Sequence, residues 1–250
     1  MLDSIEVLFA PAEFAALSSR DLSQTTCVVF DILRATTTIV TALANGAQAV
    51  IPVAEIPEAL AIRKQQPKVL LAGERDGFRI NAGLTGGIDF DLGNSPREFT
   101  ADKVKGRTIV LSTTNGSRAL RSCTTAQTVL AASFLNLRAT ADYLQRNPPA
   151  KLLLICSGTH DQAALEDALG AGALVDLLGN VSAVSDSTII AWQLYQTHRD
   201  NLLAAVSQSR NGRRLLSLPE LRDDVSLCVQ RDTLPLVAKS ENGTITRVTG

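Results

Sequence analysis

An aspartate and an arginine stand three residues apart at the end of an apolar segment. The segment VVFDILRATTTIV, residues 28–40, is typical of a buried strand followed by a helix, with Asp31 and Arg34 at the junction and Thr36 and Thr37 at the helix start. A helix N-terminus offers N–H groups and the positive end of a dipole, which favour an anion. A carboxylate there can bind a metal ion or act as nucleophile or base. The alternative is an Asp–Arg ion pair with a threonine N-cap.

A glycine-rich segment follows a second strand. In LLAGERDGFRINAGLTGGIDFDLGNSP, residues 70–96, Glu74 and Arg75 come directly after the strand. Glycines let backbone N–H groups approach a ligand closely, and carboxylates suit hard cations. Loops this long in compact domains are commonly functional, so we assign Glu74 and Arg75, with Asp31 and Arg34, to catalysis. For Asp89 and Asp91, a solvated loop is an equally good interpretation.

A third strand leads into a turn rich in hydroxyl groups. The segment TIVLSTTNGSRAL, residues 108–120, contains five candidate substrate-binding residues after its strand: Thr113, Thr114, Asn115, Gly116 and Arg118. Such a turn can form a concave set of N–H groups that holds a phosphate, although an ordinary Asn-Gly turn has the same sequence. The Walker A pattern GxxxxGK[ST] is absent.

A fourth strand, in LLLICSGTHDQAALEDALGAG, residues 152–172, ends at Ser157 and Gly158, which are candidates for substrate contacts, as are Thr36 and Thr37. The helix that follows carries Glu166 and Asp167 among apolar residues, where burying an unpaired charge is costly. This acidic pair is either a metal site or a solvated face. We expect the turns at Gly73, Thr113 and Ser157 to face the same edge of the sheet as Asp31.

The elements that position these residues follow from two alternating periodicities. Short apolar, β-branched runs indicate strands at residues 26–33, 49–53, 68–71, 108–111, 128–130 and 152–156. Helical patterns cover residues 35–44, 57–65, 117–122, 135–145, 163–178 and 185–206. The strands are apolar at consecutive positions, which is typical of a sheet covered by helices on both faces. We therefore predict a three-layer α/β/α fold with a largely parallel or mixed sheet. Residues 1–250 are interpreted as one unit with a weak boundary near residue 179, and residues 210–250 as docked on the main body.

Composition excludes several classes of protein. The net charge is −1, so nothing favours nucleic acid or an anionic membrane as a partner. We find no apolar run near the roughly 18 residues of a membrane helix and no basic leader at the N-terminus. The four cysteines are far apart, without a CxxC pair, which argues against zinc and favours the reducing cytoplasm. Cys156 and His160 are best interpreted as a buried thiol and a loop histidine.

Eight short motifs lie in an order that matches a known family, between about Asp31 and Asp232: FDILRATTTIV, GERDGFRI, DLGNSP, TTNGSRAL, SFLN, CSGT, LEDALGAG and SRNGRRLL. In these motifs the chain resembles the 2-phosphosulfolactate phosphatase (ComB-like) family. The resemblance implies a Mg²⁺-dependent phosphatase that hydrolyses (R)-2-phospho-3-sulfolactate to 3-sulfolactate and phosphate, a step of coenzyme M biosynthesis in organisms that make that coenzyme. It also implies an α/β architecture and a homodimer. Ser117 stands where the family usually has threonine, and residues 81–87 resemble an insertion.

The implied substrate carries a phosphate, a carboxylate and a sulfonate. Three arginines near strand ends can meet these charges: Arg34, Arg75 and Arg118. Mg²⁺ commonly uses one or two carboxylates together with phosphate oxygens and water. The candidate ligands are Asp31, Glu74, Glu166 and Asp167.

The nucleophile and the substrate leave alternatives open. Haloacid-dehalogenase phosphatases carry a second aspartate two residues after the nucleophile, where this chain has Leu33. We therefore favour a metal-bound water over Asp31 as the nucleophile. The other interpretations are a phosphatase for another small phosphorylated hydroxy acid, a non-catalytic protein that binds anionic metabolites, and a phosphoryl transferase.

Overall fold

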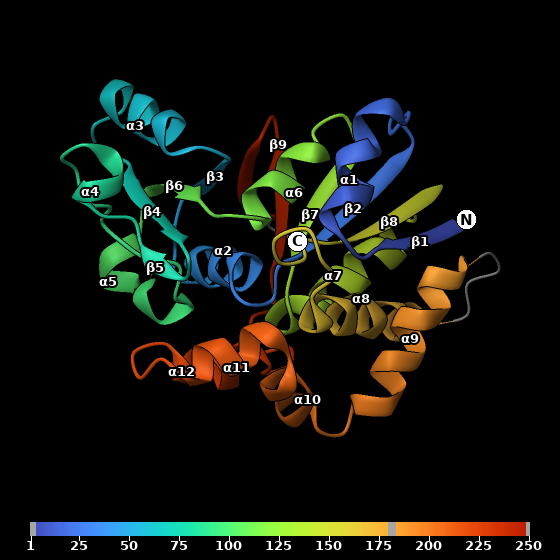
Figure 1. Ribbon diagram of the computed structural model, residues 1–250. Helices are drawn as coiled ribbons and strands as arrows, with labels where there is room; N and C mark the ends of the chain where they lie inside the picture. The colour runs from blue at the N-terminus through green and yellow to red at the C-terminus, as the bar shows by residue number, and fades with distance from the viewer. Residues whose placement is uncertain (1–3, 180–183, 249–250) are drawn as a thin grey trace.

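Ten strands form one mixed sheet in the computed structural model, which describes residues 4–179 and 184–248 (Figure 1). A first parallel group contains β1 (Ser4–Leu8), β8 (Lys151–Cys156), β2 (Thr25–Phe30) and β7 (Thr128–Ala132). A second parallel group contains β3 (Ala49–Val53), β6 (Thr108–Ser112) and β4 (Leu70–Arg75). The hairpin of β9 (Val237–Glu241) and β10 (Thr244–Val248) joins the groups, and the short β5 (Phe78–Arg79) lies at the edge beside β4.

The two parallel groups run in opposite senses. β9 is antiparallel to β7, β10 is antiparallel to β9, and β3 is antiparallel to β10. Three reversals in succession turn the second group against the first. Only one residue pair, Ile245 with Val50, joins β10 to β3, so the sheet is weakly connected at this point. A largely parallel or mixed sheet was predicted, and the observed sheet is mixed.

Helices cover both faces of the sheet, as the consecutive apolar residues of the strands predicted. In β2 every residue is buried. Val28 and Phe30 belong to a core shared with α7 (Leu137–Arg146) and α8 (Leu165–Leu178). Cys27 and Val29 belong to a second core shared with α1 (Pro11–Ala15), α2 (Ala35–Ala44) and α6 (Gly116–Ser122). β2 is therefore a central strand between two helical layers.

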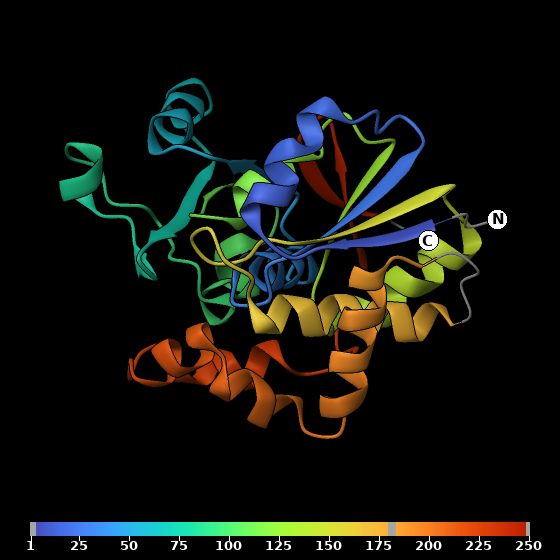
Figure 2. The same ribbon diagram turned by 45° about the vertical axis from the view of Figure 1, so that its right-hand side comes forward.

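The remaining helices include a C-terminal group that docks beside α8 (Figure 2). Its members are α9 (Asp186–His198), α10 (Leu202–Gln208), α11 (Arg210–Leu216) and α12 (Arg222–Cys228). Elsewhere lie α3 (Ile56–Gln65), α4 (Ala82–Thr85), α5 (Ala101–Val104) and three short 3₁₀ helices, Ala16–Ser19, Pro96–Glu98 and Phe134–Asn136. No helix within the described ranges is both long and apolar enough to cross a membrane.

The helix predicted over residues 185–206 is wrong as a single element. The chain forms α9 and α10 instead, because the Asn201 side chain accepts a hydrogen bond from the N–H of Ala204 and begins a new helix. α8 and α9 approach closely at Gly172, where an added Cβ would lie 2.0 Å from the Ala191 carbonyl oxygen. The predicted docking of residues 210–250 on the main body is confirmed for residues 210–248, since β9 and β10 form the joining hairpin; residues 249–250 lie outside the described ranges.

Candidate active site

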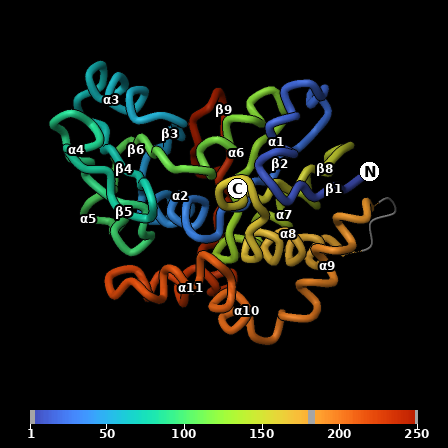
Figure 3. Tube along the Cα trace, viewed as in Figure 1, coloured from blue at the N-terminus to red at the C-terminus, as the bar shows by residue number. Residues whose placement is uncertain are grey.

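The carboxyl ends of β2 and β8 meet those of β4 and β6 at one cleft. β2 and β8 are parallel neighbours in the first group, and β4 and β6 are parallel neighbours in the second. The predicted meeting of the turns after β4, β6 and β8 with Asp31 is therefore confirmed, although the two groups of strands run in opposite senses within the sheet. The chain passes from the first group to the second through α2 (Figure 3). The cleft has a volume of about 100 Å³ and lies beyond the strand ends, where open α/β sheets bind ligands.

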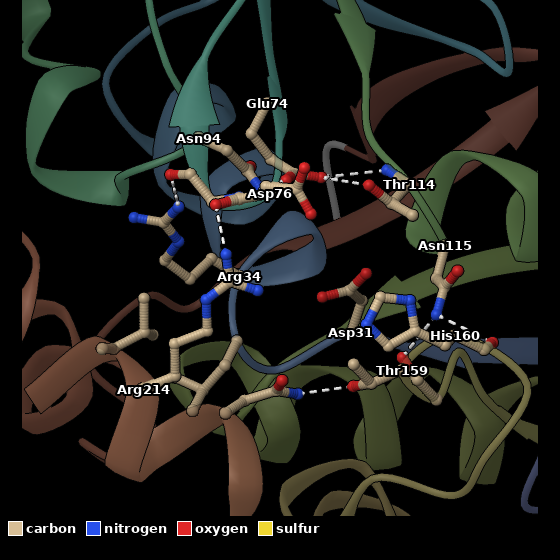
Figure 4. A pocket seen from close by; sticks show the side chains of 15 residues that line it. Asp31, Arg34, Glu74, Asp76, Asn94, Thr114, Asn115, Thr159, His160 and Arg214 are labelled. Atoms are coloured by element: carbon tan, nitrogen blue, oxygen red, sulfur yellow. Dashed lines mark hydrogen bonds between the residues drawn. The ribbon is translucent and has the colours of Figure 1, made fainter. Parts of the chain in front are cut away.

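Asp31 follows β2 directly and lies in the centre of the cleft (Figure 4). Its Oδ1 accepts a hydrogen bond of 3.0 Å from the N–H of Ala35, the first residue of α2, whose N–H has no partner within the helix. Oδ2 lies against Gly116, where an added Cβ would stand 2.5 Å from it. Burial, together with the charges of Glu74 and Glu166, raises the pKa of Asp31 to about 6. The site therefore contains several carboxylates that destabilise one another's ionised forms.

Glu74 is the second carboxylate in the cleft, and it lies within β4 rather than after it. Its Oε1 accepts hydrogen bonds from the N–H and the hydroxyl of Thr114, at 2.9 and 3.0 Å. Its Oε2 accepts one from the N–H of Gly77 at 2.8 Å. Figure 4 shows Glu74 across the cleft from Asp31. These bonds fix Glu74 between the loop after β6 and the β4–β5 turn.

Arg34 lines the cleft and is 3% exposed. Its Nη1 donates to Oδ2 of Asp224 at 2.8 Å, and its Nη2 donates to the Gly77 carbonyl oxygen at 2.8 Å. Asp224 is fully buried and also accepts hydrogen bonds from Ser95 and Arg97. The Asp–Arg ion pair considered from the sequence thus exists with a different aspartate, 190 positions away. Asp31 is left to face the cleft.

Glu166 and Asp167 are buried at the start of α8, not solvated. Asp167 accepts hydrogen bonds from the N–H groups of Ile32 and Gly158, so it joins the loops after β2 and β8. Burial and the nearby charges of Asp31 and Glu166 raise its pKa well above the usual range. Oε1 of Glu166 accepts a hydrogen bond from Asn211, whereas its buried Oε2 has no partner among the described residues.

The carboxylates fit a divalent cation that keeps most of its ligands as water or substrate. Among residues 4–179 and 184–248, no three His, Cys, Asp or Glu side chains converge as a complete metal site. Asp31 and Glu74 nevertheless face one cleft, and the unpartnered Oε2 of Glu166 adds a buried acceptor within range of the charge of Asp31. Asp167 is committed to two backbone N–H groups. One or two carboxylates are the protein ligands that Mg²⁺ commonly takes.

Several predicted site residues support the loops instead of lining the cleft. The guanidinium group of Arg75 donates to carbonyl oxygens of Glu74, Ser112 and Ala54 and to the Ser112 hydroxyl. The predicted metal ligands Glu166 and Asp167 also lie outside the cleft lining, as do the side chains of Thr36, Thr37, Thr113, Arg118 and Ser157. The Thr36 hydroxyl accepts from the Asp31 N–H, Thr37 donates to Ile32, and Thr113 bonds to Ser117. Arg118 is exposed, and the buried Ser157 hydroxyl has no partner among the described residues.

Three predicted substrate-binding residues do line the cleft: Thr114, Asn115 and Gly158. Asn115 donates to the Gly158 carbonyl oxygen at 2.9 Å, which ties the loop after β6 to the loop after β8. Gly116 does not line the cleft, but its missing side chain makes room for Asp31. Asp89 and Asp91 lie elsewhere, where Asp89 accepts from the Ala82 N–H and Asp91 pairs with Arg63.

Sequence reasoning missed six polar residues of the cleft: Asp76, Asn94, Thr159, His160, Asn211 and Arg214. All of them except His160 belong to the motifs GERDGFRI, DLGNSP, CSGT and SRNGRRLL. The motifs therefore marked these positions, although reasoning from strand ends did not. His160 is a loop histidine, as predicted, and Cys156 is a buried strand thiol. All four cysteines are buried and unbridged.

Comparison with known proteins finds close relatives. The model of a family described as 2-phosphosulpholactate phosphatase matches residues 14–243. A protein of Caldanaerobacter subterraneus subsp. tengcongensis, named probable 2-phosphosulfolactate phosphatase, is 36% identical over 236 residues, covering 93% of this chain and 94% of its own length. Proteins with the same name are 42% identical in Thermotoga petrophila, covering 87% of this chain and 90% of their own, and 37% identical in Carboxydothermus hydrogenoformans, covering 93% and 91%.

Proposed function

The chain belongs to the 2-phosphosulfolactate phosphatase family, and from this premise we propose that it hydrolyses (R)-2-phospho-3-sulfolactate to 3-sulfolactate and inorganic phosphate. One observation on this chain itself supports the proposal independently of the family name. Two carboxylates, Asp31 and Glu74, and the buried guanidinium of Arg34 line one small cleft at the strand ends. This is the combination that a phosphoryl group needs, with acidic residues for a cation and a fixed positive charge for its oxygens.

We propose Mg²⁺ as the cofactor, held by Asp31 and Glu74, with Glu166 as a further ligand or an acceptor for its water. When bound, the cation supplies positive charge that offsets the negative charge of the phosphoryl oxygens. A cation held there would also favour the ionised form of Asp31, because burial raises the pKa of this carboxyl to about 6. Asp167 remains a support for the loops after β2 and β8, because both of its oxygens accept backbone N–H groups.

Arg34 and Glu74 have different roles in the proposed mechanism. Arg34 neutralises a phosphoryl oxygen, and its orientation is set by Asp224 and by the Gly77 carbonyl. Glu74 fixes the Thr114 loop through two hydrogen bonds, so the N–H groups of that loop keep one position during the reaction. Because these groups are already oriented, little reorganisation accompanies the transfer of charge.

We propose that water, not Asp31, attacks phosphorus. The water oxygen forms a bond to phosphorus while the bond between phosphorus and the C2 oxygen of the substrate breaks. The C2 oxygen leaves as the hydroxyl of 3-sulfolactate, after taking the proton that the attacking water gives up. A phosphorylated Asp31 trapped by rapid quench would contradict this step.

The direct test is phosphate release from (R)-2-phospho-3-sulfolactate with and without Mg²⁺. We expect release that needs the cation, and a loss of at least about 100-fold in Asp31→Asn, because one protein ligand changes charge. Asp89→Asn is the matched control, since Asp89 is exposed and outside the cleft. Faster release from other phosphorylated hydroxy acids would reassign the substrate, and ligand binding without release from any of them would indicate a binding protein.

We also propose that the protein is cytoplasmic, because four buried, unbridged cysteines suit a reducing compartment.

We propose in addition that it forms a homodimer. The exposed side chains of Ile189, Ile190 and Trp192 on α9 offer an apolar surface to a second copy. Analytical ultracentrifugation tests the assembly, and a monomer at micromolar concentration would contradict it.

A further inference from the structure

A second arginine, Arg214 of α11, lines the cleft beside Arg34 (Figure 4). Arg34 donates to the carbonyl oxygen of Gly77 at 2.8 Å, and Arg214 donates through Nη2 to that of Asp76 at 2.5 Å. Asp76 and Gly77 are consecutive residues of the β4–β5 turn. Two guanidinium groups from opposite ends of the sequence are therefore held next to each other by a single turn.

The two arginines differ in what surrounds them. Arg34 is buried and its charge is paired with Asp224. Arg214 is exposed and forms no ion pair with any carboxylate of the described residues; its one hydrogen bond goes to a neutral carbonyl. Because the carbonyl uses only one Nη2–H, the second Nη2–H and the N–H beside it, on Nε or on Nη1, stay available to a ligand. A planar group with two donors in parallel matches a carboxylate or sulfonate.

The helix that carries Arg214 is rigidly placed. An added Cβ at Gly212 would lie 1.8 Å from the Val206 carbonyl oxygen, so α11 packs directly on the backbone of α10. Ser209 caps the helix by accepting from the Gly212 N–H, and Leu215 is buried. Arg210 of the same helix does not line the cleft and is engaged with Gln162 and with the carbonyl oxygens of Thr159 and Ala163. Arg214 is thus the residue of α11 that offers a charge to the cleft.

The balance of charges in the cleft indicates what the guanidinium group of Arg214 binds. The substrate of the proposed function carries two anionic groups that do not react, and the cleft already contains the carboxylates Asp31, Glu74 and Asp76. Arg34 and the proposed cation serve the phosphate. A further anion in this acidic cleft needs a positive charge of its own.

We propose that Arg214 is a specificity-determining residue that binds one non-reacting anionic group of the substrate, its carboxylate or its sulfonate. The inference rests on the proposed function for the identity of the substrate. The reacting phosphate lies with Asp31, Glu74 and Arg34. Arg214 binds the carboxylate or the sulfonate of the same substrate from the rim of the cleft. A C-terminal helix therefore determines which substrate is preferred, whereas residues at the strand ends bind the phosphate that reacts.

The test compares Arg214→Met with Arg213→Met on four phosphate esters. Arg213 is the matched control because it is the neighbouring exposed arginine on α11 and lies outside the cleft lining. The esters are 2-phospho-3-sulfolactate, 2-phospholactate without the sulfonate, 2-phosphoethanesulfonate without the carboxylate, and ethyl phosphate without either. Circular dichroism and Tm establish that both variants are folded. Arg214→Lys tests whether a positive charge without the planar guanidinium is sufficient for binding the anionic group.

We expect Arg214→Met to lower kcat/KM for the full substrate about 10- to 100-fold, the effect of one charge-assisted hydrogen bond or pair of bonds, mainly through KM. The loss should vanish for ethyl phosphate and for whichever analogue lacks the group that Arg214 binds, and Arg214→Lys should recover part of it. An equal loss on ethyl phosphate, or an equal loss in Arg213→Met, would overturn the proposal.

A calorimetric titration with 3-sulfolactate, which has both anionic groups and no phosphate, separates this proposal from the proposed function. If wild type releases no phosphate from any ester, the proposed function fails while the binding experiment still decides the role of Arg214. Weaker binding in Arg214→Met than in Arg213→Met supports the proposal. Equal binding in the two variants, or no binding to wild type, overturns it.

Discussion

Replacing Asp224 with asparagine removes the only carboxylate that pairs with Arg34 among the described residues. The variant keeps the shape of the side chain and one acceptor oxygen, so no cavity forms. Arg34 then remains 3% exposed with a full positive charge and no counter-charge, and Arg97 loses its shorter carboxylate contact, 2.7 Å. An uncompensated buried charge is strongly destabilising.

The expected loss in the free energy of unfolding is about 3 kcal/mol. Breaking a buried ion pair costs roughly 3–5 kcal/mol, and the remaining amide oxygen places Asp224→Asn at the lower end. This is a large part of the roughly 5–15 kcal/mol that stabilises a typical domain. Catalysis should suffer as well, because Arg34 loses the partner that orients it. We expect kcat/KM to fall about 100-fold under conditions where the variant is folded.

Urea unfolding followed by circular dichroism measures the stability change as a shift in the midpoint at constant slope. Asp223→Asn is the matched control. Asp223 is the preceding residue, contacts the same Arg97 at 3.5 Å and has a side chain that is 66% exposed, so its loss should stay below about 0.5 kcal/mol. A change below about 1 kcal/mol in Asp224→Asn, or one equal to the control, would refute the reasoning.

Three further predictions concern the carboxylates of the cleft. Because the pKa of Asp31 is raised to about 6, its ionisation costs the folded state more than the unfolded state, where the pKa is about 4. Asp31→Asn should therefore be more stable than wild type in chelator above about pH 7, by up to about 3 kcal/mol, with the difference gone below about pH 4 in urea titrations; an equal or lower stability at pH 8 would be inconsistent with this. Glu74→Gln should raise the Mg²⁺ concentration for half-maximal phosphate release at least about 10-fold, because it removes a charge from the proposed cation site; an unchanged requirement would rule Glu74 out as a ligand. Gly116→Ala should lower kcat while leaving urea stability within about 2 kcal/mol, because the new Cβ would stand 2.5 Å from Oδ2 of Asp31; full activity would show that this oxygen is free to move.

The sequence by itself determined the local elements and the residues at the strand ends. The helix Ala35–Ala44 and the strand Ala49–Val53 have the predicted bounds, because helical and extended periodicity depend on neighbours a few positions away. The position of Asp31 between a buried strand and a helix start followed from the same signal. Glu74, Thr114, Asn115 and Gly158 were likewise found at strand ends and line the cleft.

Only the tertiary structure decided which of these side chains face one another. The hairpin at residues 237–248 enters the middle of the sheet and reverses one group of strands against the other, and no local pattern encodes a pairing partner about 200 residues away. Arg34 and Arg75 look equivalent in the sequence, yet one lines the cleft and the other supports a loop, because side-chain direction depends on packing with distant elements. Asp224 and Arg214 reach the cleft from C-terminal helices for the same reason: long-range contacts, not local periodicity, bring them to Asp31.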